Sequence, residues 1–540
     1  MVTAALPYAN GEIHLGHLAS TYLPPDIFVR FLRLKGVETY FICATDDFGT
    51  PILIQAEREG KSPQEFVRGW WKRDLEDFEA VGIKFDIFHQ TSSPENVAFV
   101  QEFFLRLYRA GYIYRREVQQ YYCEHDKKFL PDRYLRGTCP FCGARDQYGD
   151  YCEVCGRTYS PSELRDRACA LCGRPPSLRS VPHYFFRLSA FSDRLREWLR
   201  GNGRLQEDVV NYVMRWIEEG LADWDITRDI SWGVPIPLEE AEGQVLYGWF
   251  DNHLCYISAA LLLLGHEGER KWNEATIYHF IGKDIVYHHY LFLPAMRLAD
   301  GRFKLPDYIP TRGHLLLQGK KISKSRRWYI SLRDFLAAFP ADYLRFYLAY
   351  ITPLSQADVN FDWDDFREKI NSELVDNFGN YAYRVLTLLR REGGGVPEPG
   401  TLSQEDEGAL KRMAQACRAC GERLQEGRFD AALREAMDFS RFCNAYLQAK
   451  APWARREGYR AALWVGANTL RSLAILLYPF IPSSAERLWR LLGLKGEVGK
   501  GPWESASSPL IPPGHRIAEA YPLFRRIERD EIEGLKAKLG

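Results

Sequence analysis

Hydrophobic positions form short continuous runs in the first half of this chain and helically spaced stretches in the second half. The runs at 39–44 and 276–282 are typical of buried strands, and each leads through a polar loop toward a helical pattern. A short apolar start at 2–6 precedes another loop and helix. Strand, loop and helix in this order predict an open parallel sheet, which binds ligands at the carboxyl ends of its strands.

Two other patterns interrupt and follow this one. Between about residues 112 and 221 the sequence has short strands, turns and clustered cysteines. Sheet-like sequence returns at 244–251, and we expect a further strand at 308–317. From residue 364 onward helical spacing predicts an antiparallel bundle, with helices expected at 366–391, 405–425, 431–447, 460–478 and 484–492.

Composition indicates a multidomain globular protein. The 540 residues are too many for one core, and 46% hydrophobic with 26% charged residues is ordinary for such a chain. No apolar run approaches the roughly 18 residues of a membrane helix, and the start lacks the features of a signal or transit peptide, so we expect a cytoplasmic protein. The formal net charge is zero, so a nucleic acid would have to be held by local basic patches.

The loop after the apolar start carries an informative local motif. His14 and His17 stand three residues apart with Gly16 between them, at the predicted start of a helix. Unpaired N–H groups and the helix dipole favour phosphate at such a position. Gly16 would let a nucleotide approach the backbone, and the imidazoles could donate hydrogen bonds to a phosphoryl group. Taken alone, the motif also fits two surface histidines at a helix cap.

Three further loops carry polar residues near expected strand ends. Asp46 follows the first buried run and could either meet a substrate cation or cap a helix. Asp284 follows the second run and could hold a pair of ribose hydroxyls. Residues 320–327 include five cations interleaved with serines, which suits a mobile loop that closes on polyphosphate or a solvated basic turn.

Seven of the twelve cysteines lie between residues 123 and 172. Two C-x2-C pairs separated by nine residues have the spacing of a four-thiolate structural zinc site. A third pair needs two more ligands, for which Cys123 and either Asp126 or His125 are available. Four-cysteine sites leave no open coordination position, so the metal is expected to shape an insertion. The predicted ligands are Cys139, Cys142, Cys152 and Cys155 at the first site, and Cys123, Asp126, Cys169 and Cys172 at the second.

One face of the expected 366–391 helix carries Asp376, Asn380 and Arg384, which are spaced by four residues. These side chains could read the edges of nucleotide bases. The other interpretation is a solvated helix face. Both interpretations place the three residues on a common surface of the predicted bundle.

Together the motifs resemble those of one enzyme family. His14-Leu-Gly-His17 and, about three hundred residues later, Lys321-Ile-Ser-Lys-Ser325 are similar to the HIGH and KMSKS motifs of class I aminoacyl-tRNA synthetases. Further matches resemble methionyl-tRNA synthetases in particular, and the paired knuckles resemble their archaeal and eukaryotic branch. These matches keep the family's order along the chain, at 5–11, 129–133, 224–228, 231–237, 279–287 and 451–453.

The resemblance implies ATP-dependent activation of methionine to methionyl-adenylate and transfer to tRNA(Met), with Mg²⁺ accompanying ATP as substrate. The implied catalytic residues, which would stabilise the α-phosphate and hold the leaving pyrophosphate, are His14, His17, Lys321 and Lys324. The implied ATP-binding residues are Gly16, Gly282, Asp284, Lys321 and Lys324. The implied amino-acid pocket comprises Leu6, Tyr8, Asp46, Trp249, Asn252, His253, Tyr256, His288 and His289. The implied anticodon-reading residues are Asp376, Asn380, Arg384 and Trp453.

Several of these positions depart from the family pattern. The usual Trp-x-Asp-Ala-Pro-Ile-Gly-Tyr run has Asn252 and His253 in place of alanine and proline. His288 replaces an aromatic residue, and Leu293 replaces a tryptophan. These changes predict a roomier and more polar pocket than a thioether requires. Asp376 stands where asparagine is usual, and a carboxylate neither donates to a base nor attracts phosphate.

We therefore expect an α/β class I synthetase fold, with a Rossmann-like parallel sheet, a zinc-knuckle insertion and a C-terminal all-α anticodon-binding bundle. The expected function is that of a methionine–tRNA ligase. The alternatives are a paralogue that activates a different, more polar amino acid or metabolite, and a non-catalytic tRNA-binding relative. Because no further tRNA-binding domain follows the bundle, we expect a monomer. The expected parts are the two halves of the catalytic domain at 1–111 and 236–318, the knuckle insertion at 112–235, the basic loop and stem-contact region at 319–365, the anticodon-binding domain at 366–520 and a returning C-terminal helix at 521–540.

Overall fold

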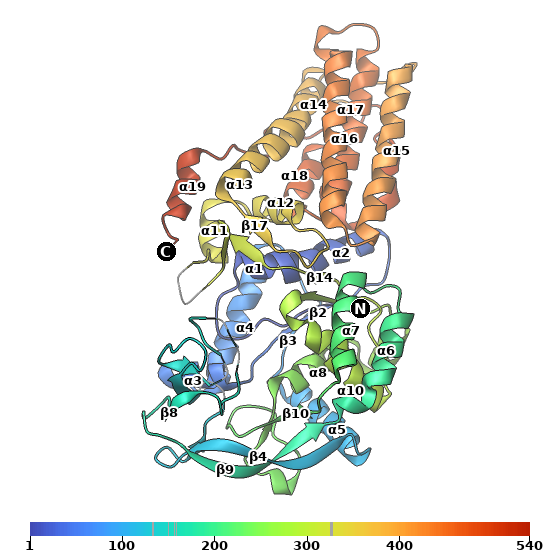
Figure 1. The fold of residues 1–540 in the computed structure, drawn as a ribbon. Coiled ribbons are helices and arrows are strands. Elements are labelled where there is room, and N and C mark those ends of the chain that lie inside the picture. Colours follow the sequence, from blue (N-terminus) through green and yellow to red (C-terminus); the bar gives the residue numbers. More distant parts are fainter. Residues whose placement is uncertain (132–133, 150, 156, 158, 324–327, 540) are drawn as a thin grey trace.

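A five-stranded parallel sheet lies at the centre of the protein (Figure 1), in the order β14-β13-β1-β2-β3. The first strand of the chain is thus the middle strand of the sheet, flanked on one side by strands that come more than 250 residues later. The strands are β1 Val2–Ala4, β2 Phe41–Thr45, β3 Ile87–Gln90, β13 Tyr278–Gly282 and β14 Thr311–Arg312. The computed structural model describes residues 1–131, 134–149, 151–155, 157, 159–323 and 328–539.

Helices connect and cover the strands of this sheet. The helix α2 contacts β1 and β2, while α8 contacts β2 and β3 and packs along α5. The helix α8 is buried from Phe250 to Ala260 because its sequence is apolar on nearly all sides. A capping box between Ser62 and Glu65 fixes the start of α4. The main helices here are α2 Leu23–Leu34, α3 Thr50–Arg58, α4 Pro63–Ala80, α5 Pro94–Arg109, α8 Gly248–Leu264 and α10 Leu293–Asp300.

The insertion between the two halves of the sheet forms a long antiparallel ribbon at the foot of the view in Figure 1. Its strands β4 and β9 pair from Ile113 opposite Phe186 to Tyr122 opposite Ser177. A small sheet in the order β7-β6-β8 carries the cysteine knuckles, and two helices follow the ribbon. The elements are β4 Ile113–Cys123, β5 Lys128–Phe129, β6 Leu135–Thr138, β7 Gln147–Tyr148, β8 Arg165–Cys169, β9 Ser177–Phe186, β10 Trp224–Asp225, α6 Ser192–Gly201 and α7 Glu207–Glu219.

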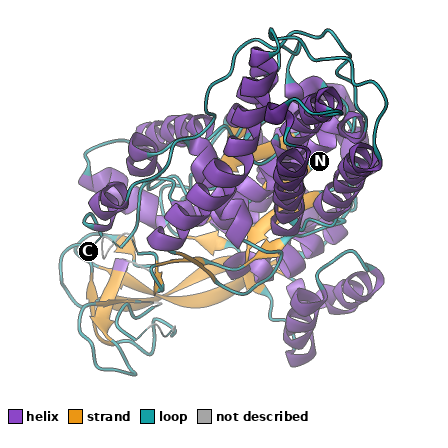
Figure 2. Cartoon of the chain, turned by 90° about the horizontal axis from the view of Figure 1, so that it is seen from above, coloured by secondary structure: helices purple, strands orange, loops and turns teal. Residues whose placement is uncertain are grey.

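The C-terminal part is a bundle of long helices above the sheet (Figure 1), and the view from above in Figure 2 shows these helices lying over the rest of the chain. Its first helix is continuous from Trp363 to Arg391, although its middle has the wider π-helical winding. The helices are α12 Ala341–Ile351, α13 Trp363–Lys369, η8 Ile370–Gly379, α14 Asn380–Arg391, α15 Gln404–Gln425, α16 Phe429–Lys450, α17 Tyr459–Leu477 and α18 Pro482–Leu491.

The chain then returns to the junction between sheet and bundle. The last helix, α19 Arg529–Lys536, contacts α11 Leu332–Ala338 and α13, and it buries Ile532 and Leu535. Lys538 forms an ion pair with Asp334 of α11 at 2.7 Å. The C-terminal segment therefore lies against the helix that follows the basic loop.

Two stretches differ from the elements expected from the sequence. The stretch 244–251 was expected to be sheet-like, but only β12 Val245–Leu246 is a strand and α8 begins at Gly248. Apolar periodicity does not distinguish a short strand from the start of a buried helix. The expected strand at 308–317 is split into β14 and β15 Leu315–Leu317. Between them the Gly313 N–H donates to the Ser355 carbonyl at 2.9 Å, and an added Cβ at Gly313 would lie 2.1 Å from the carbonyl oxygen of Ala357.

The helices expected in the bundle are present within a few residues of their expected bounds. None of the helices in the described ranges is both long and apolar enough to cross a membrane.

Candidate active site

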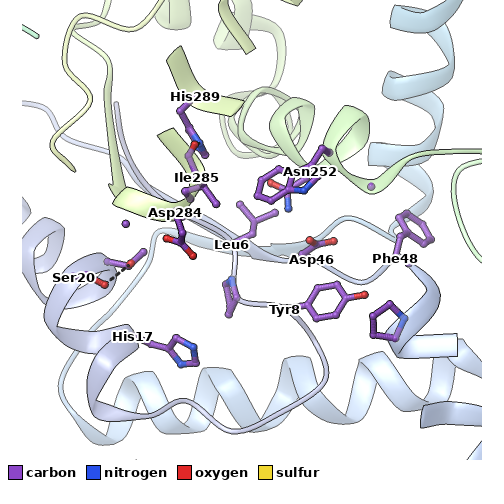
Figure 3. A pocket seen from close by; sticks show the side chains of 18 of the residues that line it. Leu6, Tyr8, His17, Ser20, Asp46, Phe48, Asn252, Asp284, Ile285 and His289 are labelled. Atoms are coloured by element: carbon purple, nitrogen blue, oxygen red, sulfur yellow. Dashed lines mark hydrogen bonds between the residues drawn. The ribbon is translucent and has the colours of Figure 1, made fainter. Parts of the chain in front are cut away.

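A cavity of about 610 Å³ opens at the carboxyl ends of the central strands (Figure 3). Its walls come from the loops that follow β1, β2, β13 and β14, together with the start of α8 and the hairpin after β15. In Figure 3, Asp284 and His17 lie toward one side of the cavity, and Asp46 and Asn252 lie toward the other. The arrangement provides two neighbouring subsites, as expected for an open parallel sheet.

The two histidines of the first loop are held at the start of a helix. His14 caps α1 Leu15–His17, which continues into η1 Leu18–Tyr22 and α2. The Nδ1 atom of His14 accepts from the Gly16 N–H at 3.2 Å, and Nδ1 of His17 accepts from the His14 N–H at 3.3 Å. The rings are stacked with centroids 3.6 Å apart. Because Nδ1 is the acceptor in both rings, a neutral imidazole carries its proton on Nε2, where it can serve as a donor.

Gly16 is closely packed at this turn. A Cβ atom at this position would lie 3.1 Å from Cε1 of His14 and 3.1 Å from Cδ1 of Ile322. Ile322 lies in the basic segment, residues 320–327. The first loop and the basic segment therefore touch each other across Gly16.

The basic segment begins as a hairpin between β15 and β16 Lys320–Lys321. Gln318 and Gly319 occupy the turn with φ of 52° and 74°. This turn places the exposed Lys321 on the cavity wall. Lys324, the other predicted catalytic lysine, lies outside the described residues.

Asp284 lies in the turn η6 Lys283–Ile285, directly after β13. His314 holds the pKa of Asp284 below its ordinary value, with Nε2 of the histidine 3.6 Å from the carboxylate. A Cβ at Gly282 would lie 2.8 Å from Oδ1 of Asp284. The neighbouring Lys283 instead pairs with Asp358 at 2.6 Å. Asp284 is thus an ionised acceptor at the cavity wall, which suits a pair of hydroxyl groups.

Asp46 follows β2 at the opposite side of the cavity. Its N–H donates to the carbonyl of Pro7 at 2.8 Å, and its carbonyl accepts from Ala9 at 2.9 Å, so the first loop is tied to the end of β2. Burial raises the pKa of Asp46 to about 7, the charge of Asp47 adds to this rise, and a hydrogen bond from Asn252 opposes it. Among the described residues, Oδ1 of Asp46 has no hydrogen-bond partner. This oxygen is available to a cationic group.

The wall beside Asp46 is apolar and aromatic, with a histidine held neutral at its back. His289 donates from Nδ1 to the Ile285 carbonyl at 3.1 Å, so its Nε2 accepts from the Tyr256 hydroxyl at 3.1 Å. Burial lowers the pKa of His289 to about 3. The predicted pocket residues that line the cavity are Leu6, Tyr8, Asp46, Trp249, Asn252, Tyr256 and His289.

The other two predicted pocket residues lie behind this wall. His288 is stacked on Trp249, with ring centroids 3.8 Å apart and planes inclined by 13°. His253 is fully buried, with its ring 4.7 Å from that of His289. Neither His253 nor His288 is part of the cavity lining. The structure therefore places them in a second layer and not on the cavity surface.

The cysteines gather into two clusters in the insertion. In the first, Sγ of Cys139 is 3.9 Å from Sγ of Cys155, and Sγ of Cys142 is 3.6 Å from Sγ of Cys152. A tetrahedral zinc with Zn–S bonds of 2.3 Å has edges of about 3.8 Å, so these separations fit such an ion. The four ligand atoms all lie within 4.8 Å of one another.

In the second cluster, distances between side chains indicate which residue is the fourth ligand. Oδ2 of Asp126 lies 3.1 Å from the sulfur atoms of both Cys123 and Cys169, and Cys172 is 3.5 Å from Cys123. His125 instead lies beside this group, with Nδ1 at 3.1 Å from the other oxygen of Asp126. Of the two candidates, Asp126 is the one grouped with the three thiols.

The predicted anticodon-reading residues lie on neighbouring helices of the bundle. The guanidinium of Arg384 lies over the ring of Trp453 at 5.0 Å from its centroid, and Arg384 donates to Gln448 at 3.0 Å. Trp453 is 43% exposed. Asn380 is exposed on the same helix as Arg384. Asp376 forms an ion pair with Arg526 at 2.5 Å, which offsets the charge that the sequence placed on this surface.

An unusual turn presents Trp453. Ala451 ends α16 in the left-handed region with φ of 39°, and Arg455 has φ of 52°. Residues other than glycine rarely adopt this backbone conformation, and it is found where surrounding structure or function requires it. The turn directs the helix end so that the indole remains exposed beside Arg384.

Sequence reasoning missed some residues of the cavity. His314 lines it and acts on Asp284, and Trp232 lines it while donating from its indole to the Asp47 carbonyl at 2.6 Å. Arg228 also lies on the wall. Arg228 and Trp232 belong to the matched stretches 224–228 and 231–237, so the family resemblance could have pointed to them. His314 lies outside the matched stretches, and only the folded arrangement shows its position.

Comparisons with known families agree with this geometry. Residues 1–386 match the family described as tRNA synthetases class I (M), and residues 406–533 match the anticodon-binding domain of tRNA ligase. The central parallel sheet, the histidine turn and the hairpin that meets it thus define a class I aminoacyl-tRNA synthetase.

Individual relatives identify the family within this class of synthetases. The chain is 42% identical to methionine–tRNA ligase of Methanopyrus kandleri over all of this chain and 81% of that protein, and 43% identical to the enzyme of Thermococcus kodakarensis over 98% and 74%. It is also similar to a structure of Mycobacterium tuberculosis methionyl-tRNA synthetase in complex with methionyl-adenylate, with a TM-score of 0.81, 25% identity and coverage of 97% and 99%. The chain belongs to the methionine–tRNA ligase family. The fold class and the family resemblance predicted from the sequence are confirmed.

Proposed function

We propose that this protein activates methionine with ATP in the cavity, forming methionyl-adenylate and pyrophosphate, and transfers the methionyl group to tRNA(Met). The observation that carries the proposal is the meeting of four kinds of group in one cavity. These are a paired histidine turn, a lysine from a separate hairpin, an ionised acceptor and a carboxylate with an unpaired oxygen. The family to which the chain belongs supports methionine as the amino acid.

In the proposed complex, the substrates lie across the two subsites. Asp46 receives the ammonium group of the amino acid at Oδ1, which has no partner within the described ranges. Asp284 accepts hydrogen bonds from the ribose hydroxyls of ATP. The amino-acid carboxylate is thereby held beside the α-phosphate. This positioning makes a bimolecular step effectively unimolecular.

The first chemical step is displacement at the α-phosphorus. A carboxylate oxygen of the amino acid forms the new bond, the bond from the α-phosphorus to the bridging oxygen breaks, and pyrophosphate leaves with Mg²⁺. The Nε2–H groups of His14 and His17 stabilise charge on the α-phosphoryl oxygens. Lys321 and Lys324 neutralise the pyrophosphate, and the contact of Ile322 with Gly16 keeps the hairpin at the phosphate end.

The second step transfers the aminoacyl group to RNA. A hydroxyl oxygen of the terminal adenosine of tRNA forms a bond to the carbonyl carbon of the adenylate. The bond from that carbon to the phosphate oxygen breaks, AMP leaves, and the hydroxyl proton is released. The bundle holds the anticodon at a distance from this chemistry. Stacking on Trp453 and hydrogen bonds from Asn380 and Arg384 suit unpaired bases.

We further propose that both cysteine clusters hold Zn²⁺. The sulfur separations of 3.6 and 3.9 Å in the first cluster support this assignment, as does the placement of Asp126 among three thiols in the second. Filled four-ligand sites have no open position, so zinc would order the insertion and take no part in the reaction. Metal analysis of purified protein is expected to give two zinc ions per chain.

ATP–pyrophosphate exchange with each amino acid in turn tests the proposed function. We expect exchange with methionine, and methionylation of tRNA(Met) that weakens when its anticodon is changed. Exchange with no amino acid would contradict the proposal and favour a tRNA-binding protein without catalysis.

A further inference from the structure

A layer of polar rings lies directly behind the amino-acid wall. Trp249, Asn252, His253 and Tyr256 occupy one face of α8 by their spacing of three and four residues. Three of them line the cavity, and His253 is the member set back from it. The side-chain end of the amino-acid subsite is therefore closed by this face and by the adjoining segment η7 His288–Phe292.

His253 is the unusual member of this layer. Its side chain is fully buried, yet within the described part of the chain neither Nδ1 nor Nε2 has a hydrogen-bond partner. Its ring lies 5.5 Å from that of Trp249 and meets that of His289 edge-on at 4.7 Å. These two rings line the cavity, so His253 stands one ring behind its surface.

An unpaired buried imidazole is costly unless something pairs with it. His289 cannot serve, because its nitrogens are already committed to the Ile285 carbonyl and the Tyr256 hydroxyl. Asn252 is directed to the other end of the amino acid, where it donates to Asp46. Among the described residues, the buried ring nitrogens of this layer without a hydrogen-bond partner are therefore Nδ1 and Nε2 of His253 and Nδ1 of the stacked His288.

The chemistry of this layer defines what would satisfy it. A neutral imidazole offers one N–H donor and one acceptor nitrogen. A thioether is only a weak acceptor and leaves the donor of His253 almost unpaired. An amide or sulfoxide oxygen is a strong acceptor, and it carries no net charge into the buried site.

We propose that the side-chain subsite binds uncharged amino acids of methionine's length whose side chain ends in a strong hydrogen-bond acceptor, with His253 as the specificity-determining residue. Such a side chain displaces the ring of Trp249 or His289, which line the cavity in front of His253, and accepts from the ring of His253. The proposal rests on the proposed function, since it extends the range of amino acids that the same cavity activates.

The test compares four amino acids in ATP–pyrophosphate exchange with the full-length protein. The probes are methionine, methionine sulfoxide and norleucine, which differ mainly in the polarity of the side-chain end, and glutamine is added as the amide. We expect kcat/KM for the sulfoxide to be within about tenfold of that for methionine, and kcat/KM for norleucine to be lower than that for either of them. Exchange with methionine and norleucine at similar efficiency, with none for sulfoxide or glutamine, would overturn the proposal.

Two matched substitutions test whether His253 causes the preference for a side chain that ends in an acceptor. His253→Leu should lower the sulfoxide-to-methionine ratio of kcat/KM about tenfold or more, whereas His253→Gln, of similar size and still able to donate, should keep the ratio within about threefold. Asn252→Ala should weaken both substrates alike, because it acts at the ammonium end. An unchanged ratio in His253→Leu would refute the assignment of His253, and the wild-type ratios still decide the substrate class if that variant does not fold.

The two proposals fail in different ways. Absence of exchange with every amino acid would contradict the adenylation chemistry itself. Exchange restricted to apolar side chains would leave adenylation intact and remove only the polar subsite.

Discussion

The pKa of Asp46 predicts a pH dependence of amino-acid activation. Burial raises this pKa to about 7 in the free protein, and only the ionised carboxylate attracts an ammonium group. With a pKa of 7, about 9% of the carboxylate is ionised at pH 6 and about 91% at pH 8. We therefore expect kcat/KM for methionine to rise about tenfold between pH 6 and pH 8 and then to level off.

The assay is ATP–pyrophosphate exchange with methionine varied at saturating ATP. His289 in the cavity wall and His288 behind it do not titrate in this window, because burial lowers the pKa of His289 to about 3 and that of His288 to about 4. Asp46→Asn should lower kcat/KM and abolish the rise. Asn252→Ala should shift the rise to higher pH, because the hydrogen bond that it removes favours the ionised carboxylate.

A flat profile for the wild-type protein would refute this reasoning, and so would the same tenfold rise in Asp46→Asn. The control is the pH profile of kcat/KM measured with ATP varied at saturating methionine. In that experiment the bound methionine ammonium holds the Asp46 carboxylate ionised, so the rise should be absent. Linkage also gives the sign for stability. A carboxyl whose pKa is raised on folding makes the folded state less stable as pH increases from about 4 to 7.

Other predictions address the remaining parts of the protein. Lys321→Ala should lower exchange about 100- to 1000-fold while tRNA binding measured by filter retention persists, and unchanged turnover would contradict its placement at the pyrophosphate. Gly16→Ala should also reduce exchange, because its methyl group would press on His14 and Ile322, and wild-type kinetics would show that the turn can relax. Cys139→Ser should release one of two zinc ions and lower the thermal midpoint, with retention of both ions speaking against the first cluster as a zinc site. Arg526→Ala should raise KM for tRNA without affecting exchange, because it leaves the Asp376 carboxylate uncompensated, and Asp376→Asn in the same chain should restore KM if that charge is the cause.

The sequence predicted the parts of the site that are encoded in short stretches. His14 and Lys321 lie in recognisable motifs, and Asp46 and Asp284 follow continuous apolar runs, so the carboxyl edge of a parallel sheet brings them together. The helices of the bundle were also predictable, because amphipathic spacing persists over many turns. These features depend on local sequence and on a general rule of topology.

Features that depend on packing between distant residues were not predictable in this way. Asp376 and Arg526 are 150 residues apart, and no local pattern indicates that they form an ion pair. The placement of His253 depends on whether residues 248–253 form a strand or a helix, because a strand sends alternate side chains to opposite faces and a helix groups those three and four apart. Apolar content alone left that choice open, so the depth of His253 behind the wall came only from the fold.

The most direct test of the account is to identify the adenylate formed by the protein itself. The full-length protein is incubated with ATP, Mg²⁺ and an equimolar mixture of the twenty amino acids without tRNA, and the bound product is analysed by mass spectrometry. We expect an aminoacyl-adenylate in which methionine is the main amino acid and which is lost in His14→Ala. Absence of any adenylate, or an unchanged amount in His14→Ala, would contradict the claim that this cavity carries out the activation.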